Sequence, residues 1–336
     1  MKRVGNLYEK IYSMDNLMLA DDIARKGKLK QRGVIEHDKN REANLLKLRQ
    51  MLISKTYETG PYKNFIIEEP KIREISCLDY FPHRIVHHAI MNVIEPILVA
   101  TFTADSYSNI KGKGIDAACD AVKSALHDEP GTRYCLKLDV KKFYPSIDHD
   151  ILKKLIRRKI KDGDLLQLLD GIIDSAPGVP IGNYLSQYFA NLYLNPLDHY
   201  LKEQLRVRRY YRYADDMVVF APTKAYLHAL RAEIGRYLKE NLNLSIKHNY
   251  QVFPVAARGV DFLGCVFRHT HIRLRKSIKT NYRKEAFGPK RPQVMAGYKG
   301  WADRCNSRHL VKKFTSCSTL KTSTSQQTGK DSREIR

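Results

Sequence analysis

The chain has 336 residues, of which 43% are hydrophobic, so it can bury a large core and its composition excludes an intrinsically disordered protein. Its 59 Lys and Arg against 36 Asp and Glu give a formal net charge of +23, which indicates a polyanionic partner, although a basic surface that serves solubility alone stays open. The N-terminus lacks an apolar signal region, no run approaches the roughly 20 apolar residues of a membrane span, and the six cysteines show no C-x-x-C spacing, so we expect a cytoplasmic protein with reduced thiols.

Residues 1 to about 60 are expected to form helices that are broken at Gly27 and Gly33. Between Asn44 and Leu52 the hydrophobic residues recur at helical spacing, which predicts one buried helix face. This segment indicates no chemistry of its own.

The next stretch favours strands, with a break at Pro70. Alternation over residues 71–75 places Lys71 and Arg73 on one strand face. Two cations on one face suit a triphosphate, and the planar guanidinium of Arg can also lie against a base. An edge strand with a solvated face shows the same alternation, so both interpretations remain open here.

A buried helix is predicted from about Arg84 to Val99. Three histidines lie on or beside it, but no Cys or acid completes a metal site, so we expect structural histidines at positions 83, 87 and 88. The following loop is rich in Gly and Lys and lacks P-loop spacing. Backbone phosphates of nucleic acid are the expected contacts of Lys111 and Lys113.

Residues 134–140 read as a strand that carries Asp139 near its end. Asp148 is expected to cap the helix that follows. Further on, Gly and Pro mark a loop at 177–183, and the apolar run 185–194 predicts a buried helix.

Two short strands joined by a tight turn are predicted over residues 210–220, with Asp215 and Asp216 at the turn. Adjacent carboxylates repel each other unless cations share the site. Together with Asp139 they form the acid set of a two-metal phosphoryl-transfer centre, in which two Mg²⁺ ions lie roughly 4 Å apart. An Asp-Asp pair alone is most often a solvated turn, but this pair lies between two apolar, aromatic strands.

The C-terminal third begins with a helix over residues 227–238 and a short strand-like run at 244–246 that precedes Lys247. Glycines at both ends of 259–264 predict a tight hairpin. From 268 to 313 cations dominate and aromatic residues are interleaved, as in a surface that follows a phosphate backbone; a solvated helix face is the alternative. Beyond about 315 the Ser/Thr/Gln/Lys-rich tail is expected to be disordered.

The sequence Tyr-Ala-Asp-Asp at 213–216 resembles the YADD box of reverse transcriptases, and residues 136–148 resemble the preceding acidic motif of the same palm. The resemblance spans about 60–313 and implies a right-hand polymerase fold of the α+β class. It implies N-terminal helices and fingers over 1–130, a palm over 131–265 (with about 150–185 returning to the fingers), a basic thumb over 266–314, and the tail 315–336.

This resemblance implies that a primer 3′-hydroxyl attacks the α-phosphate of a dNTP. Two Mg²⁺ ions would be held by Asp139, with Val140 beside it, and by Asp215, while Asp216 supports the site electrostatically. Lys247 is the implied general acid for the pyrophosphate leaving group, with a surface cation as the alternative.

The resemblance also implies dNTP contacts from Lys71, Arg73, Ile181 and Gly182. Tyr144 would lie under the sugar and exclude a 2′-hydroxyl, although core packing explains an aromatic residue there equally well. Gly182 would let its backbone approach the templating pair closely. The implied primer and template contacts are Lys111, Lys113, Phe262, Leu263, Gly264, Arg275, Lys276, Tyr298 and Trp301.

Most reverse transcriptases have Gln-Gly and, four residues on, Ser-Pro, whereas this chain has Ile181-Gly182 and Ser186-Gln187. That departure resembles the reverse transcriptases of diversity-generating retroelements, which copy a template RNA with frequent errors opposite adenine. An aliphatic Ile181 removes a hydrogen-bonding constraint, so mispairs are discriminated less sharply. Arg73, Ile181 and Gln187 are therefore the predicted fidelity residues, although the exchange at 181 could also be neutral.

The partners implied by this subfamily are a template-repeat RNA and its cDNA hybrid, dNTPs, and a small basic oligomeric accessory protein, in a bacterial or phage-encoded system. Two alternatives stay open. One is another bacterial reverse transcriptase, of the intron-encoded or defence kind. The other is a non-catalytic RNA-binding module, which predicts the loss of a metal acid, whereas all three acids are present.

Overall fold

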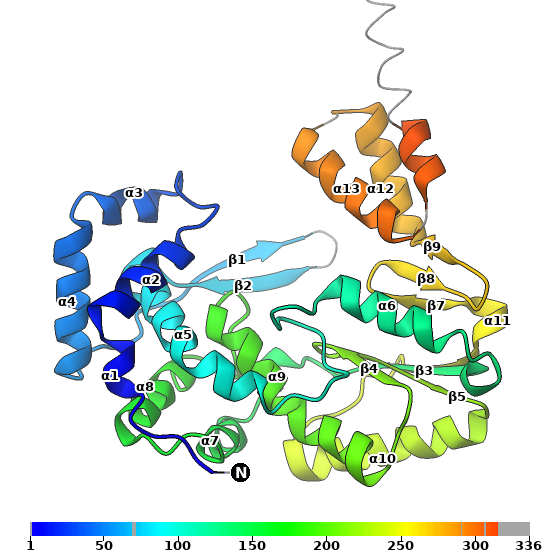
Figure 1. Cartoon of the computed structure of the whole chain (residues 1–336), viewed down its shortest axis with the longest axis horizontal. Coiled ribbons are helices and arrows are strands. Elements are labelled where there is room, and N and C mark those ends of the chain that lie inside the picture. The colour runs from blue at the N-terminus through cyan, green and yellow to red at the C-terminus, as the bar shows by residue number, and fades with distance from the viewer. Residues whose placement is uncertain (1, 69–71, 290, 306, 315–336) are drawn as a thin grey trace, which may run out of the picture. The chain divides into compact units, whose positions relative to one another are not determined.

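The structure, a computed structural model, describes residues 2–68, 72–289, 291–305 and 307–314 (Figure 1). These residues form two compact units. The first contains the described residues within 1–112, 138–217 and 229–250, and the second those within 113–137, 218–228 and 251–336. Lys71 and the predicted disordered tail 315–336 lie outside the described residues. The four-part division into fingers, palm, thumb and tail remains a prediction.

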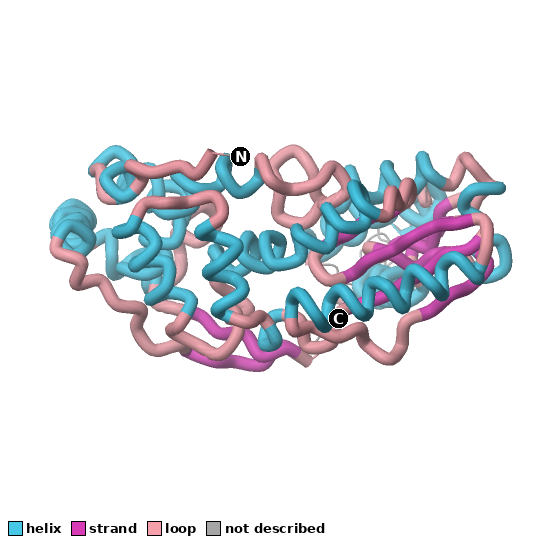
Figure 2. Tube along the Cα trace, turned by 90° about the horizontal axis from the view of Figure 1, so that it is seen from below, coloured by secondary structure: helices cyan, strands magenta, loops and turns pink. Residues whose placement is uncertain are grey.

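Short helices open the first unit (Figure 2). They are α1 (Tyr8–Ile11), α2 (Met14–Ala24), α3 (Arg32–Asp38) and α4 (Arg41–Ile53). Ser13 caps α2 by accepting a hydrogen bond from the Asn16 N–H. The predicted break at Gly27 is confirmed, with φ of 71°. The predicted break at Gly33 is wrong, because Gly33 lies inside α3, where a Cβ would meet the Tyr80 side chain at 3.0 Å.

An antiparallel hairpin follows, made of β1 (Lys63–Ile67) and β2 (Arg73–Cys77) in a register that pairs Ile67 with Arg73. Every residue of β1 is exposed, so its apolar side chains are not part of the core. A kinked turn, η1 (Tyr80–Arg84), in which Phe81 has extended backbone angles, leads into α5 (Ile85–Val99), and α5 confirms the predicted buried helix. α2 packs against α5.

The helices that support the later part of the first unit are α7 (His149–Arg157), α8 (Gly163–Ile173), α9 (Tyr184–His199) with η4 (Tyr200–Gln204), and α10 (Lys224–Leu242), which also enters the second unit. The predicted cap is confirmed, because the Asp148 carboxylate accepts a hydrogen bond from the Ile151 N–H at 3.1 Å. α9 is buried along most of its length, as its apolar run predicts.

A four-stranded sheet has the strand order β4-β5-β3-β6. Its strands are β3 (Tyr134–Asp139), β4 (Tyr210–Tyr213), β5 (Asp216–Ala221) and β6 (Gln251–Pro254). β3 pairs antiparallel with β6, and both β3 and β5 contribute residues to each unit. The predicted hairpin at 210–220 is confirmed by β4 and β5.

The second unit also holds α6 (Ile115–Ala125), the turn η2 (Pro130–Thr132), α11 (Val255–Arg258), a three-stranded antiparallel sheet and further helical segments. The sheet consists of β7 (Val260–Phe262), β8 (Cys265–Phe267) and β9 (Ile272–Leu274), and the helical segments are α12 (Lys276–Phe287), α13 (Pro292–Arg304) and residues 308–314. The predicted hairpin is confirmed, and its turn uses positive φ at Leu263 and Gly264. Within the described residues, no helix has both the length and the apolar character needed to cross a membrane.

Candidate active site

The turn between β4 and β5 carries two of the three predicted metal acids. Tyr210 and Met217, on the flanking strands, are fully buried, whereas Asp215 and Asp216 are half-buried. Ala214 adopts a left-handed conformation with φ of 53°, which is uncommon for a residue with a side chain. The aromatic and β-branched residues that favour these strands therefore anchor a strained turn that presents the acids.

Asp139 lies at the end of β3. Its Oδ2 accepts a hydrogen bond from the Lys247 ammonium at 3.2 Å, while its buried Oδ1 finds no hydrogen-bond donor among the described residues. The Lys247 N–H also donates to the Asp139 carbonyl at 2.9 Å. Backbone pairing therefore sets Lys247 beside the acid.

That pairing is a single antiparallel bridge between Val140 and Ile246, whereas the sequence suggests a short strand-like run over residues 244–246. Its two hydrogen bonds come from the flanking residues, from Lys247 to Asp139 and from Lys141 to Ser245, each at 2.9 Å. In this non-hydrogen-bonded type of pair, the Val140 carbonyl is turned away from Ile246. The Val140 carbonyl oxygen therefore accepts neither of the two hydrogen bonds of the bridge.

The environment of Asp215 disfavours its charged form. Burial, followed by the neighbouring Asp139 and Asp216 carboxylates, raises the pKa of Asp215 to about 7. Neighbouring carboxyl groups cannot both ionise at low cost without a cation. The fold provides one partial counter-charge, from Lys247 to Asp139.

These acids fit a hard divalent cation. Within the described ranges, no set of three or more His, Cys, Asp or Glu side chains could enclose a metal ion. A closed cage is not what Mg²⁺ needs, because it is commonly bound by one or two carboxylates and completes its shell with phosphate and water. The donor-free Oδ1 of Asp139 and the raised pKa of Asp215 match that open arrangement.

Tyr144 lies next to the acids, in the short 3₁₀ turn η3 (Tyr144–Ser146). Burial and then the Asp215 charge raise the pKa of Tyr144 to about 12, while the Arg73 charge acts in the opposite direction. The Tyr144 hydroxyl is therefore close enough to both groups to feel their charges. Two further predicted site residues, Arg73 and Asp215, therefore lie within electrostatic range of Tyr144.

The loop with the unusual Ile181-Gly182 sequence is attached to β2 and to the Tyr144 turn. The Ile181 carbonyl accepts a hydrogen bond from the Ser76 N–H at 2.8 Å, and the Tyr144 carbonyl accepts one from the Val179 N–H at 3.0 Å. At Gly182, with φ of 125°, an added Cβ would lie 2.5 Å from the Ser76 carbonyl oxygen. The close backbone approach of Gly182 is thus to β2, and its predicted contact with a templating pair stays a prediction.

Gln187 is exposed on α9, and Ile181 is half-buried in the loop. Their predicted effect on fidelity stays a prediction. Lys111 is exposed beside Gly112, whose φ is 79°, and Lys113 is half-buried.

Three of the predicted primer and template residues of the second unit, Gly264, Arg275 and Trp301, meet at the β7–β8 turn. An added Cβ at Gly264 would lie 2.5 Å from the Trp301 ring, and the Gly264 carbonyl accepts a hydrogen bond from the Arg275 N–H at 3.0 Å. Phe262 is fully buried, so a primer contact there would have to come from its backbone. Leu263 is half-buried beside Gly264, Lys276 is exposed, and the Tyr298 ring stacks on Tyr282 at 5.5 Å.

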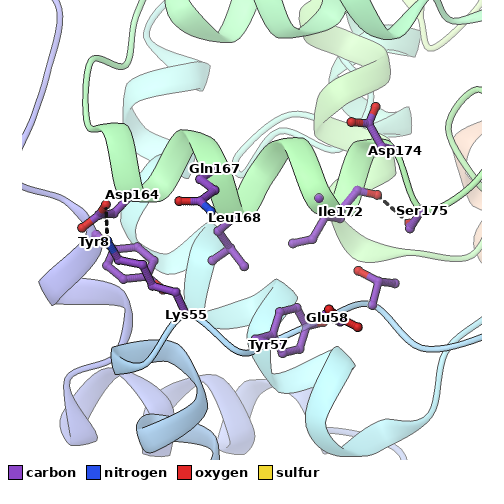
Figure 3. A pocket seen from close by; sticks show the side chains of 12 residues that line it. Tyr8, Lys55, Tyr57, Glu58, Asp164, Gln167, Leu168, Ile172, Asp174 and Ser175 are labelled. Carbon is purple, nitrogen blue, oxygen red and sulfur yellow. Dashed lines mark hydrogen bonds and ion pairs between the residues drawn. The ribbon is translucent and has the colours of Figure 1, made fainter.

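A separate pocket of about 430 Å³ lies in the first unit, between α1, α8 and the segment after α4 (Figure 3). Its charged lining is partly paired, because the Lys55 ammonium contacts the Asp164 carboxylate at 2.6 Å. None of the predicted site residues lines this pocket.

Sequence reasoning missed one residue of the hairpin, Arg212. It is a fully buried arginine, and its side chain reaches the Ala214 carbonyl at 3.0 Å. The sequence offered one signal for this role, which is the position of an arginine within a strand whose other residues are all tyrosines.

Comparison with known proteins assigns the chain to a family. The family model described as reverse transcriptase (RNA-dependent DNA polymerase) matches residues 63–267, more than half of the chain. Protein YkfC of Escherichia coli K12 is 28% identical over 264 residues, which cover 65% of this chain and 69% of YkfC. The retron Ec73 reverse transcriptase of Escherichia coli is 28% identical over 196 residues, which cover 53% of this chain and 60% of the retron enzyme.

Among solved structures, apo telomerase from Candida tropicalis is similar with a TM-score of 0.50 at 12% sequence identity. The match covers 82% of this chain and 60% of the telomerase chain. At this identity the likeness concerns the fold alone, and with the family match it confirms the predicted right-hand polymerase fold of the α+β class. The chain spans about 60% of the retron and telomerase chains.

Proposed function

The chain belongs to the reverse transcriptase family of RNA-directed DNA polymerases, and we propose that this member copies a template-repeat RNA into cDNA with low fidelity at adenines. Such copying would serve targeted sequence diversification. The polymerase part is supported by the neighbouring acids Asp139 and Asp215, since Asp139 contributes to the raised pKa of Asp215. The diversification part is supported by Ile181-Gly182 with Ser186-Gln187, where related enzymes carry Gln-Gly and Ser-Pro.

In this proposal Asp139, Asp215 and the Val140 carbonyl hold two Mg²⁺ ions, which would stabilise the attacking and leaving oxygens of an in-line displacement. Asp216 supports the site electrostatically, because it adds negative charge beside the proposed ions. Arg73, with Lys71, binds the triphosphate of the incoming dNTP, and the Tyr144 ring lies under its sugar. Lys247, which contacts Asp139 at 3.2 Å, would turn to the pyrophosphate and act as its general acid.

The low fidelity rests on the loop that carries Ile181. Its backbone is held to β2 through the hydrogen bond from Ser76, and Arg73 lies on the same strand. The loop that carries Ile181 is thereby attached to the strand that carries a proposed nucleotide-binding residue. An aliphatic side chain at this position offers no hydrogen bond, so the penalty that a polar site imposes on a mispair is reduced.

The proposed partners follow from charge and from the subfamily. A net charge of +23 suits the template RNA and the RNA–cDNA hybrid. The basic thumb and the β7–β8 turn, with Gly264 and Trp301, would track the hybrid backbone. The small basic oligomeric accessory protein is proposed from the subfamily resemblance.

The test is primer extension on a defined RNA template with Mg²⁺, followed by sequencing of the products of wild type, Ile181→Gln and Ile181→Leu. We expect wild-type errors concentrated opposite template adenine, a several-fold reduction in Ile181→Gln, and no change in the apolar control Ile181→Leu. Accurate synthesis by the wild type would retain the polymerase and overturn the diversification role. An absence of synthesis with cognate RNA and accessory protein would favour an RNA-binding scaffold.

A second candidate is a bacterial reverse transcriptase without a diversification role, which the similarity to the retron Ec73 enzyme favours. It predicts that errors are spread over all template bases and that Ile181→Gln leaves the error spectrum unchanged. The non-catalytic alternative is disfavoured, because all three acids are present and Asp139 contributes to the raised pKa of Asp215.

A further inference from the structure

Arg212 has its entire hydrogen-bonding capacity satisfied inside the first unit. Its Nε and Nη2 donate to the Asp198 carboxylate, with Nε to Oδ1 at 2.8 Å, and Nη2 also donates to the Ser106 hydroxyl at 2.6 Å. Nη1 donates to the Asn191 side-chain oxygen at 3.1 Å and to the Ala214 carbonyl at 3.0 Å. A guanidinium has five N–H groups, and here each has an acceptor.

One of these acceptors belongs to the turn that carries the acids. Ala214 immediately precedes Asp215 and has a φ of 53°. A non-glycine residue in this region costs free energy and persists only where its surroundings hold it. The hydrogen bond from Arg212 to the Ala214 carbonyl is such a restraint.

The guanidinium is itself held from several directions. Asp198 on α9 accepts further hydrogen bonds from the Tyr210 hydroxyl at 2.7 Å and the Ser106 hydroxyl at 2.8 Å. The Asn191 amide donates to the Ser108 carbonyl at 2.6 Å, and Ser106 forms a parallel bridge with Arg212. A rigid cluster drawn from α9, residues 106–108 and β4 therefore ends on the catalytic turn.

We propose that Arg212 is a positioning residue that holds the Ala214 carbonyl and so fixes the turn in which Asp215 faces Asp139. This inference rests on the proposed metal-binding role of those two acids. It is independent of the diversification role.

A purely structural role makes a different prediction. Replacing a buried ion pair with apolar residues of similar volume is often neutral or stabilising. If Arg212 only fills and neutralises the core, the double variant Arg212→Met with Asp198→Leu should fold and retain activity. If it positions the turn, that variant should fold and lose activity.

Arg212→Lys separates the two roles in a second way. A lysine retains the charge beside Asp198 but lacks the planar fork that reaches Asn191 and the Ala214 carbonyl together. The matched control is Arg25→Lys, since Arg25 contacts another fully buried acid, Asp21, at 2.7 Å in the same unit and has no contact with the turn.

The experiment measures kcat, KM for dNTP, the Mg²⁺ concentration at half-maximal rate, and Mn²⁺ binding by electron paramagnetic resonance, in proteins shown to be folded by circular dichroism. For Arg212→Lys we expect kcat to fall roughly 10- to 100-fold, as a misplacement near 1 Å can cause, with the KM for dNTP changed less than about 3-fold. The Mg²⁺ midpoint should rise and Mn²⁺ binding should weaken several-fold. Arg25→Lys should match the wild type in all four measurements.

Wild-type kcat, Mg²⁺ midpoint and Mn²⁺ affinity in either folded Arg212 variant would overturn the proposal. If the wild type extends no primer, the proposed function has failed at that step, and Mn²⁺ binding still decides the positioning role. Equal Mn²⁺ affinity in wild type and Arg212→Lys would then reject it, and weaker affinity in the variant would support it.

Discussion

Two carboxylates of the first unit, Asp198 and Asp215, have opposite surroundings. Asp198 is fully buried and receives hydrogen bonds from Arg212, Tyr210 and Ser106. Asp215, only 17 residues along the chain, faces Asp139 and Asp216, and its pKa is raised to about 7. The fold thus supplies a cation and several donors to the acid that supports the hairpin, whereas burial and two neighbouring carboxylates dominate the surroundings of the acid that would meet a metal.

This contrast assigns a separate purpose to each acid. A satisfied buried network specifies one conformation of the chain. An acid pair that is short of positive charge is unfavourable alone and becomes favourable when a cation arrives. Variants that exchange or remove charge on either side should therefore affect different properties.

The largest expected effect is on activity, in Asp215→Asn. The amide keeps the size of the side chain and removes the anionic ligand, so we expect primer extension to fall on the order of 10³-fold or more, equivalent to about 4 kcal/mol in the barrier. Thermal stability without metal should stay equal or rise, because a repulsive charge is lost. Activity within 10-fold of the wild type would contradict the assigned metal role.

The next effect is on stability, in Asp198→Asn. Removing this charge leaves Arg212 buried without its counter-ion, which typically costs about 3–5 kcal/mol. Urea unfolding, followed by circular dichroism, measures the change. Asp170→Asn, which removes the partner of the partly exposed Arg157, is the control and should cost under about 1 kcal/mol. Equal losses in the two variants would contradict the special cost assigned to the fully buried Arg212–Asp198 pair relative to the partly exposed Arg157–Asp170 pair.

A third prediction concerns pH. The unfolded chain releases the Asp215 proton near pH 4, whereas the folded chain releases it near pH 7. Between these values the folded state binds more protons, so the free energy of unfolding of the metal-free protein falls as pH rises. Asp139→Asn removes a neighbouring charge and should recover about 1–3 kcal/mol at pH 8 and little at pH 5.

Urea unfolding in a chelator at the two pH values measures this effect. Addition of Mg²⁺ at pH 8 should stabilise the wild type and leave Asp139→Asn nearly unchanged. If the free energy of unfolding depends on pH in the same way in both proteins, the charges of Asp139 and Asp215 do not interact.

The smallest effect is expected for Lys247→Met. Lys247 contacts Asp139 at 3.2 Å and is partly exposed. We expect kcat to fall about 10-fold, below the usual 10²–10⁴-fold for a general acid, because a metal would take most of the leaving-group charge. The alkaline limb of the pH–rate profile should shift. The control is Lys141→Met, which removes an exposed cation two residues from Asp139. It should change neither kcat nor the alkaline limb of the pH–rate profile.

Local pattern was sufficient for the hairpin, because aromatic and β-branched residues surround two turn-forming acids at 210–220. It was also sufficient for α5 and for the Asp148 cap. The Gly33 break was wrong, because a helix tolerates glycine where another side chain, here Tyr80, packs closely. Propensity describes the residue itself and carries no information about that neighbour.

The support behind the hairpin could not be predicted in the same way. Arg212 binds Ser106, which is 106 positions away, and Asp198, which is 14 positions away, and each of these is an ordinary polar residue in its own segment. Similarly, the attachment of Ile181 to Ser76 joins a loop to a strand about a hundred residues earlier. Such partners become visible only when the chain is folded.

The packing of Trp301 on Gly264 has a spectroscopic consequence. Trp301 is the single tryptophan of the chain, and its ring packs so closely on Gly264 that an added Cβ would lie 2.5 Å from it, with the Arg304 guanidinium 5.0 Å from the ring centre. Excitation at wavelengths that tyrosine does not absorb therefore reports on the β7–β8 turn and α13 alone. A quench or spectral shift upon addition of an RNA–DNA hybrid would follow this contact in real time, without any introduced label.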